Sequence, residues 1–343
     1  MTNFTPKRAK RQKLRLAMQL IGPSGSGKTL GGLILAYGMM KEKYPEMDEF
    51  DLWGKIGLVD TEHERALIYE GMQFGTTTVG QFFHMDLQKP YSFESYKRSV
   101  DGLVKEGVEV VIIDSASHAW EGEGGVLDLQ QELGGKFQSW NDANKQAYNP
   151  LVSLLVGEMH GVHIISTVRA KQDYAMQKNE HTEKMEIAKL GLKPIQRDSL
   201  EYEMQIVLRI DMDHKFLASK DNSTLFKDQY GTIEQEHGAN LYKWVEKGED
   251  IFAERRAAEE AALQKRISRV EAMQAKVEEY GLQEWSEKMI SHPAVGPLLT
   301  ASEDMLNKYA QTLAFQIKEI DAKNKAELAE QHADAEQVSV EGK

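Results

Sequence analysis

Apolar residues in the first two thirds of the chain alternate between the spacing of strands and the spacing of helices. Short apolar runs predict strands at residues 14–21, 55–59, 76–86, 108–114 and 162–167. Apolar positions three and four apart predict helices at 30–40, 93–105 (with Ser92 as N-cap) and 144–159, where Pro150 bends the helix or marks its first turn. Strands alternating with helices predict an α/β domain with a mainly parallel, twisted sheet.

Two segments of this domain depart from the alternation. Residues 120–141 are rich in glycine, and we expect a mobile loop with a short helix there. Residues 171–197 have no clear period, which predicts a long loop, and long loops in compact domains are often functional. Residues 202–210 and 214–219 then predict an antiparallel strand pair with Lys220 at its end.

After about residue 250 the composition shifts to Ala, Glu, Lys and Arg, and the apolar spacing becomes helical. Leu263, Ile267, Val270 and Val277 share one helical face, and Gly281 ends that helix. The same spacing returns after Ser302, at Leu306, Tyr309, Leu313, Ile317 and Ile320. We therefore expect four parts: a basic arm at 1–13, an α/β core at 14–247, a small helical appendage at 250–326 and an acidic, disordered tail at 327–343.

Charge and composition narrow the class of protein. The 343 residues carry a formal net charge of −12, yet residues 1–16 hold six basic side chains and no acidic one. We expect this arm either to contact phosphate or an acidic neighbouring subunit, or to be a solvated terminus. The chain has no cysteine, which excludes disulfides and thiol catalysis. It also has no apolar run long enough to span a bilayer, so we expect no membrane segment.

The candidate chemistry begins where the first predicted strand ends. Residues 22–29 match the phosphate-binding P-loop pattern G-x-x-x-x-G-K-T between a strand and a helix. The alternative is a flexible glycine–serine turn. Such a turn would not require both glycines, the lysine and the threonine of the pattern, or its position between a strand and a helix. Glycines let backbone N–H groups point at phosphate oxygens, Lys28 reaches the β and γ phosphates, and the Thr29 hydroxyl binds Mg²⁺. We therefore expect a nucleotide to bind Gly22, Pro23, Ser24, Gly25, Ser26, Gly27, Lys28 and Thr29.

Two carboxylates at strand ends complete the predicted site. One apolar run ends in Asp114, the position typical of a carboxylate that holds Mg²⁺ through its water shell. The next residue is Ser115, where many ring ATPases have a catalytic glutamate. Glu62 follows the second predicted strand, and strand ends of this kind face the crevice in which nucleotides bind. We therefore expect Glu62 to orient and deprotonate the attacking water.

The order of these motifs resembles that of the RecA-like ATPases, most closely the phage-encoded branch associated with single-strand annealing and recombination. The resemblance covers about residues 14–247. It rests on the P-loop, Asp60-Thr61-Glu62-His63, Ile112-Ile113-Asp114-Ser115, Ser166-Thr167-Val168-Arg169, residues 191–198 and Ser219-Lys220-Asp221. It implies a RecA-like P-loop NTPase core that binds ATP and Mg²⁺ and forms a homo-oligomer, a ring or a filament, with ATP at subunit interfaces.

The resemblance also implies roles for single residues. Glu62 is the expected catalytic base, Thr167 is expected to sense the γ-phosphate, and Lys220 is expected to reach the γ-phosphate of a neighbouring subunit unless it is a solvated turn lysine. The segment after Thr167 is expected to bind DNA. Its lysines interleaved with an aromatic suit single-stranded nucleic acid, the alternative being a solvated surface loop. The residues concerned are Lys171, Tyr174, Lys178 and Lys184.

Two positions differ from the family pattern. Thr167 stands where RecA-like proteins usually have glutamine, and Asn222 stands where a second basic residue follows Lys220. Thr167 is shorter than glutamine and could couple the nucleotide to the following segment differently. Asn222 cannot supply a second charge to a neighbouring site.

We therefore expect an ATPase that binds single-stranded DNA and acts in phage recombination or annealing. The N-terminal residues lack the apolar stretch of a secretory signal, so we expect a cytoplasmic protein, in the host cytoplasm if a phage encodes it. An alternative is a replication accessory ATPase, a helicase loader or remodeller that acts on a protein partner. A P-loop kinase for a small molecule would need an arginine-rich lid, and we find no convincing one in the sequence.

Overall fold

A computed structural model of the chain describes residues 8–178, 185–291, 296–299 and 301–341, with side chains described outside 172–190, 251–259 and 327–341. The chain divides into two compact units between Asp250 and Ile251. Within the described ranges, none of the helices has both the length and the apolar character needed to cross a bilayer.

The first unit is an α/β domain. Its strands are β1 Ala17–Gly22, β2 Ile56–Asp60, β3 Gln73–Phe74, β4 Thr77–Thr78, β5 Phe83–Asp86, β6 Val110–Asp114, β7 His163–Lys178, β8 Met185–Pro194, β9 Ile206–Ile210, β10 Lys215–Asp221 and β11 Gly231–Thr232. Its helices are α1 Lys28–Lys43, α2 Glu49–Trp53, α3 Phe93–Lys105, α4 Ala116–Glu121, α5 Val126–Glu132, α6 Ser139–Ala143, α7 Asn149–Leu155, α8 Leu200–Glu203 and α9 Gln235–Val245, with the 3₁₀ helix η1 Arg65–Tyr69 and the short π-helix η2 Asn144–Tyr148.

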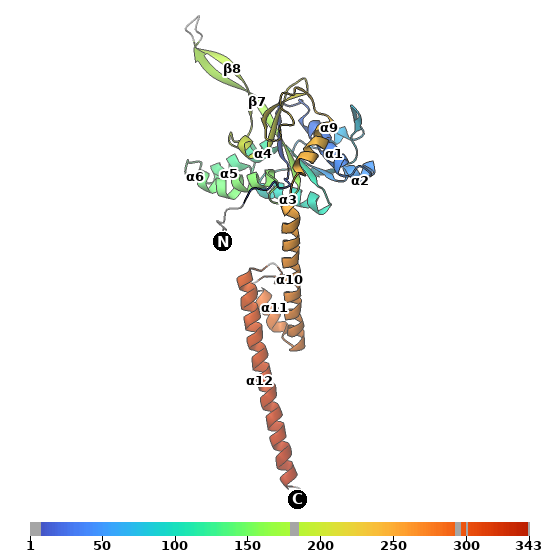
Figure 1. Cartoon of the computed structure of the whole chain (residues 1–343). Helices are drawn as coiled ribbons and strands as arrows, with labels where there is room; N and C mark the ends of the chain where they lie inside the picture. The colour runs from blue at the N-terminus through green and yellow to red at the C-terminus, as the bar shows by residue number, and fades with distance from the viewer. Residues whose placement is uncertain (1–7, 179–184, 292–295, 300, 342–343) are drawn as a thin grey trace. The chain divides into compact units, whose positions relative to one another are not determined.

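The main sheet has the order β11–β10–β9–β1–β7–β6–β2–β5, with β8 paired to β7 (Figure 1). The pairs from β9 to β5 are parallel, whereas β10 runs antiparallel to β9 and β11. The strand that carries Thr167, β7, therefore lies between the P-loop strand β1 and the Asp114 strand β6. Because parallel strands end at the same edge, this order brings the P-loop, Thr167, Asp114 and Asp60 together.

Both faces of the sheet are buried, which explains why its central strands are continuous apolar runs. Along β1, Met18 and Leu20 pack with α1, α2 and α9, while Ala17 and Ile21 pack with α3, α4, α5 and α7. Helices α1 and α9 approach closely at a glycine, because a Cβ on Gly38 would lie 2.1 Å from a backbone oxygen of α9 (Figure 1). This contact holds the start of α9 beside the P-loop helix.

The elements predicted around the P-loop are confirmed with small shifts of their ends. The predicted helix at 93–105 has the same bounds in α3, and Ser92 is its N-cap. The strands β9 and β10 form the predicted antiparallel pair. Strand β9 begins at Ile206 because the preceding residues form α8.

Three segments differ from the prediction. Residues 120–141 form parts of α4, α5 and α6 where a mobile loop with one short helix was expected, because buried apolar residues such as Val126 anchor these helices and the glycines lie in the turns between them. The predicted strand at 76–86 is two short strands, β4 and β5. The predicted helix at 144–159 lies within a longer continuous helical run, which comprises α6, the π-helical segment η2 and α7; the run begins earlier than predicted, at Ser139, and ends earlier, at Leu155, with Pro150 in the first turn of α7.

The segment 171–197, predicted to be a long loop, is mostly an antiparallel ribbon. Strand β7 pairs with β1 as far as Arg169 and with β8 from Ala170 to Lys178 (Figure 1). A ribbon of this kind satisfies its backbone hydrogen bonds by its own pairing. Because it is not layered between helices, apolar alternation is not required of it, and the sequence pattern therefore did not reveal the strands.

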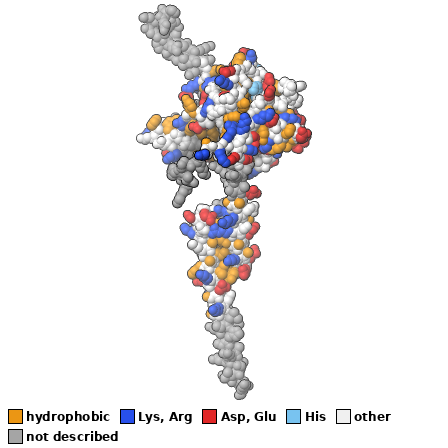
Figure 2. All heavy atoms as spheres, in the orientation of Figure 1, with side chains coloured by type: hydrophobic (Ala, Val, Ile, Leu, Met, Phe, Trp, Pro, Cys, Tyr) orange, Lys and Arg blue, Asp and Glu red, His pale blue; other side chains and the backbone are white. Residues whose placement is uncertain are grey.

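The basic segment before β1 is paired within its own chain. Lys10 and Lys13 form ion pairs with Glu249 and Glu246 at 2.9 and 2.6 Å, and Arg11 donates a hydrogen bond to the Trp244 carbonyl at 2.7 Å. The acidic partners of these described basic residues therefore belong to the same chain, whereas the sequence suggested phosphate, an acidic neighbouring subunit or solvent; Lys7 lies outside the described residues. On the face of the protein shown in Figure 2, acidic and basic side chains are interspersed, so the net charge of −12 forms no single acidic surface there.

The second unit consists of α10 Ile251–Glu279, α11 Gln283–Ser291 and α12 Glu303–Glu341 among its described residues. Its core contains residues that the helical spacing placed on one face, including Val270, Val277, Leu306 and Tyr309. Helix α12 extends to Glu341, so the described part of the tail that was expected to be disordered, residues 327–341, is helical. The reason is local, because that segment is rich in alanine, glutamate and glutamine, which are good helix formers.

Candidate nucleotide-binding site

The P-loop connects β1 to α1 in a conformation that needs its glycines. Gly25 and Gly27 have φ of +83° and +89°, in the left-handed region that favours glycine. A Cβ on Gly22 would lie 2.4 Å from the Ile210 carbonyl oxygen, so this glycine allows the loop to pass close to β9. The predicted residues 22–29 therefore form one loop at the N-terminus of a 16-residue helix, a geometry that suits an anionic phosphate.

Lys28 is the first residue of α1, directly after the glycines of this loop, and is 7% exposed. Its Nζ donates a hydrogen bond to the Pro23 carbonyl at 2.8 Å. Burial lowers the pKa of Lys28, while the carboxylates of Asp114 and Glu62 oppose the shift. Bound phosphates would act in the same direction as these carboxylates and favour the charged ammonium.

Asp114, at the end of β6, accepts a hydrogen bond on each carboxylate oxygen. The Thr29 hydroxyl donates to Oδ2, and the Thr167 hydroxyl donates to Oδ1 at 2.5 Å. Burial raises the pKa of Asp114, and the two hydroxyls oppose this shift. The pair of hard oxygen donors from Thr29 and Asp114 fits Mg²⁺, which is usually held by one or two protein oxygens together with water and phosphate oxygens.

Glu62 is placed by a turn that Asp60 holds. The Asp60 carboxylate accepts hydrogen bonds from the backbone N–H groups of Glu62 at 2.6 Å and Ala66 at 3.1 Å. Glu62 Oε1 then accepts a hydrogen bond from Arg169 Nε at 2.7 Å. The sequence placed Glu62 and Arg169 in separate motifs, and it did not reveal that they pair, because their contact depends on the strand order.

A second hydrogen-bond network links this turn to α4. The Thr61 hydroxyl accepts a hydrogen bond from the Ser115 N–H at 2.9 Å and shares another with His118 Nδ1 at 2.6 Å. The His118 ring stacks on Tyr91 with 4.8 Å between centroids. Burial and the nearby Arg169 lower the pKa of His118. The ends of β2 and β6 are thus tied to the start of α4.

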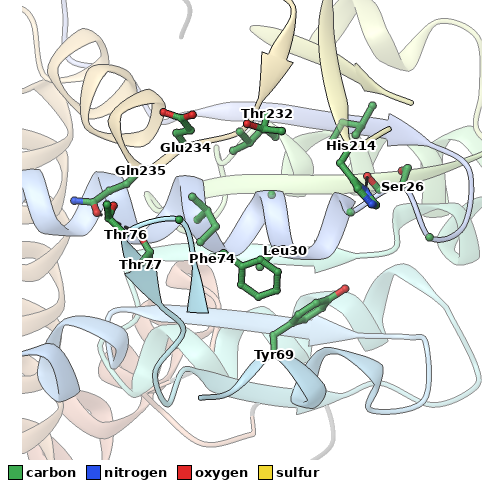
Figure 3. Close-up of a pocket in the computed structure, with 17 residues that line it drawn as sticks. Ser26, Leu30, Tyr69, Phe74, Thr76, Thr77, His214, Thr232, Glu234 and Gln235 are labelled. Atoms are coloured by element: carbon green, nitrogen blue, oxygen red, sulfur yellow. Dashed lines mark hydrogen bonds between the residues drawn. The ribbon is translucent and has the colours of Figure 1, made fainter. Parts of the chain in front are cut away.

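A pocket of about 630 Å³ opens beside the P-loop (Figure 3). Its apolar lining includes Leu30 of α1, Tyr69 of η1 and Phe74 of β3, and Glu234 and Gln235 contribute polar groups on the side of α9. A volume of this size lies in the range of small-molecule sites, about 300–1,000 Å³. The pocket can therefore hold a base and ribose whose phosphates lie in the loop. The only sequence signal was an aromatic residue a few positions after Glu62, which is weak.

His214 and Gln235 fix the rim of this pocket. The Nδ1 of His214, in the turn between β9 and β10, lies 3.1 Å from the Ser26 carbonyl oxygen in a hydrogen bond. The Thr77 hydroxyl donates to the Gln235 side-chain oxygen at 3.2 Å. The first contact connects the P-loop to the β9–β10 turn and the second connects β4 to α9, and in both cases the two elements are far apart in the sequence.

Of the remaining predicted residues, Lys220 and Lys171 lie outside this cluster. Lys220 is at the end of β10, beside Ile206 and Val207 at the start of β9, and its Nζ donates to the Tyr202 carbonyl at 2.5 Å. Because β10 is antiparallel to β9, Lys220 lies at the opposite end of the sheet from the P-loop. Lys171 is exposed on β7. The side chains of Tyr174 and Lys178, and all of Lys184, lie outside the described residues.

The α/β fold and the geometry of this site are compatible with the core of a P-loop NTPase. No family model matches the chain. It is 30% identical over 104 residues, 30% of this chain and 21% of the relative, to the signal recognition particle 54 kDa protein of Aeropyrum pernix. It is 31% identical over 127 residues, 35% of this chain and 25% of the relative, to the protein of the same name from Saccharolobus solfataricus.

The matched region spans about a quarter or less of the length of these curated relatives. The similarity is distant, and it indicates a P-loop nucleotide hydrolase in general terms. It implies the use of a nucleotide and Mg²⁺ without specifying the base.

Proposed function

We propose that the protein is a RecA-like ATPase that binds single-stranded DNA and acts in phage recombination or annealing. The observation that carries the proposal is the course of β7. This strand presents Thr167 to Asp114 at the nucleotide site, and four residues further on it presents Lys171, where the ribbon begins. A single strand thus connects the γ-phosphate position to the expected DNA-binding segment. The choice of ATP and of phage recombination rests on the motif resemblance.

The proposed reaction is attack of water on the γ-phosphorus, with cleavage of the bond to the bridging oxygen and release of ADP and phosphate. Glu62 accepts the proton of the water. Lys28 and the backbone N–H groups of the P-loop stabilise the charge that develops on the phosphate oxygens. Mg²⁺, when bound beside Thr29 and Asp114, supplies Lewis-acid stabilisation of the same charge.

Arg169 gives Glu62 a defined position before the nucleotide binds. Its hydrogen bond to Glu62 Oε1 at 2.7 Å occupies one oxygen of the base, and its backbone N–H donates to the Ser117 hydroxyl at 2.9 Å. A triphosphate in the loop would compete with Glu62 for the Arg169 guanidinium. Arg169 lies two residues after Thr167 and directly before Ala170, where the pairing with β8 begins. A movement of Arg169 towards the triphosphate would therefore shift the start of the ribbon.

The proposal includes assembly into a homo-oligomer in which Lys220 serves the site of a neighbouring subunit. Its position at the sheet end opposite the P-loop supports action outside its own site. A Lys28→Ala subunit keeps Lys220, and a Lys220→Ala subunit keeps its P-loop. Mixing the two inactive proteins should partly restore hydrolysis, whereas full activity of Lys220→Ala alone would contradict the role.

The coupling is tested by measuring the affinity for single-stranded DNA with a non-hydrolysable ATP analogue, with ADP and without nucleotide. We expect the analogue with Mg²⁺ to raise the affinity about 5- to 150-fold, the usual size of coupling between two sites. Equal affinity in all three states would contradict the proposal. Hydrolysis that responds to a protein partner and not to naked DNA would favour a replication accessory ATPase.

A further inference from the structure

A groove of about 960 Å³ lies at the base of the β7–β8 ribbon, separate from the nucleotide pocket. One wall comes from α4, α6 and the segment between α5 and α6, with Trp120, Trp140 and Phe137. The other wall comes from the start of the ribbon and the residues that follow it, with Lys171 and Lys193 among them. The groove therefore combines aromatic rings on one side with cations on the other.

The aromatic wall has an unusual degree of exposure. Phe137 is 90% exposed, although a phenylalanine ring gains stability when it is buried. Trp120 and Trp140 are stacked on each other with 6.0 Å between centroids and 19° between planes. They are partly buried against the second core face, so they form a fixed support beside the free ring of Phe137.

The cations of the opposite wall are available to a ligand. Lys171 is exposed, and Lys193 is 3.8 Å from Asp198 in an ion pair that is open to solvent and therefore weak. Arg197 is held more firmly, because its guanidinium lies 4.5 Å from the centre of the Tyr148 ring and donates to Asn144 Oδ1 at 2.8 Å. The three cations exceed the two acidic groups of the groove, Glu121 and Asp198.

We propose that this groove binds a short stretch of single-stranded DNA, with bases stacked on Phe137 and Trp140 and phosphates at Lys171 and Lys193. The inference rests on the proposed function and gives it a site. Exposed rings beside cations suit single strands, because every base has a face that can stack and the backbone carries one charge per nucleotide. Arg197 lies over aromatic rings and acts as a fixed part of the wall.

Both walls of the groove continue directly into the nucleotide site. Helix α4 begins two residues after Asp114 and ends with Trp120 and Glu121. Strand β7 carries Thr167 and then Lys171. Gln196, which lines the groove, donates to the buried Gln19 of β1 at 2.9 Å. A DNA strand in the groove would therefore contact the two elements, α4 and β7, that lie next to the Asp114 carboxylate and carry the Thr167 hydroxyl.

The test measures binding of a fluorescein-labelled oligothymidylate to the full chain by anisotropy over a range of salt concentrations. Phe137→Ala should weaken binding about 5- to 150-fold, the effect of losing one stacked base. The double variant Lys171→Gln, Lys193→Gln should reduce the slope of log affinity against log salt by about 1.4, because each single-strand phosphate contact contributes about 0.7. Matched controls are Phe50→Ala, a 69% exposed phenylalanine on α2, and Lys105→Gln on α3, neither of which should change binding.

Wild-type affinity and slope in both groove variants would overturn the inference while leaving the proposed function intact. No binding of DNA by the wild-type protein would overturn both. Photo-crosslinking of an oligonucleotide that contains iododeoxyuridine gives an independent result. Adducts on the peptides that carry Phe137, Trp140, Lys171 or Lys193 support the groove, and adducts confined to peptides outside the groove would overturn it.

Discussion

Replacing Tyr69 with alanine should weaken nucleotide binding without disturbing the phosphate site. Tyr69 lies on η1 and its ring faces the 630 Å³ pocket beside the P-loop (Figure 3). The ring is half-buried, so the change removes one wall of the pocket and leaves no closed cavity. Burial raises the pKa of its hydroxyl, so the ring stays neutral at ordinary assay pH and Tyr69→Phe should bind as the wild type does.

The expected loss follows from the contact that is removed. An aromatic ring stacked on a base contributes about 1–3 kcal/mol. Because Tyr69 is only half-buried, we expect a loss in the lower part of this range, about 1–2 kcal/mol. This corresponds to a dissociation constant that is roughly 5- to 30-fold higher. The loss should be similar for ATP and GTP, since both purines offer a face for stacking.

Isothermal titration calorimetry with ATP and with tripolyphosphate, which has no base, separates the pocket from the loop. Tyr69→Ala should lower the affinity for ATP and leave the affinity for tripolyphosphate unchanged, whereas Lys28→Ala should lower both affinities. Ile68→Ala is the matched control, because this neighbour on η1 is 65% exposed and does not line the pocket. Wild-type ATP affinity in Tyr69→Ala would refute the assignment of the pocket to the base, and an equal loss for tripolyphosphate would show that the change acts through the P-loop.

Two further predictions concern the carboxylates. Glu62→Gln should keep nucleotide affinity and lower the turnover number by about 10²- to 10⁴-fold in a phosphate-release assay, because the amide fills the space but cannot accept a proton; normal turnover would require another base. Asp114→Asn should raise the melting temperature of the nucleotide-free protein at neutral pH and abolish stabilisation by Mg²⁺ and nucleotide. Burial raises the pKa of Asp114 above its usual 3.8, so the folded protein binds this proton more tightly than the unfolded chain. Its charge therefore costs stability as the pH rises above about 3.8, and the melting-temperature advantage of the variant should grow with pH in that region and vanish below it. An advantage that does not depend on pH would contradict this cause.

The sequence predicted those parts of the site that consist of consecutive residues. The glycines and the lysine of residues 22–29 are consecutive, so the sequence alone indicates the shape of the loop. Asp114 follows an apolar run of β-branched residues, which indicates the end of a buried strand. The contacts that depend on the order of strands were not predictable in this way. Arg169 reaches Glu62 because β7, β6 and β2 are adjacent, and Gln235 reaches the pocket because α9 packs on Gly38 of α1.

The ribbon and the groove were missed for different reasons. Strand prediction depends on a buried face, and the residues from Ala170 to Lys178 pair with β8 outside the layered sheet. The glycines between 120 and 141 favoured a loop, whereas they serve as turns between short helices that carry Trp120 and Trp140.

Steady-state phosphate release by the wild-type protein and by Lys28→Ala, with ATP and Mg²⁺ in the presence and absence of single-stranded DNA, tests the central claim most directly. Lys28 is the residue of the P-loop that contacts the β and γ phosphates in the proposed complex. The wild-type protein should hydrolyse ATP and do so faster with DNA, and Lys28→Ala should show background release in both conditions. Wild-type hydrolysis by Lys28→Ala, or wild-type hydrolysis that DNA does not change, would contradict the account.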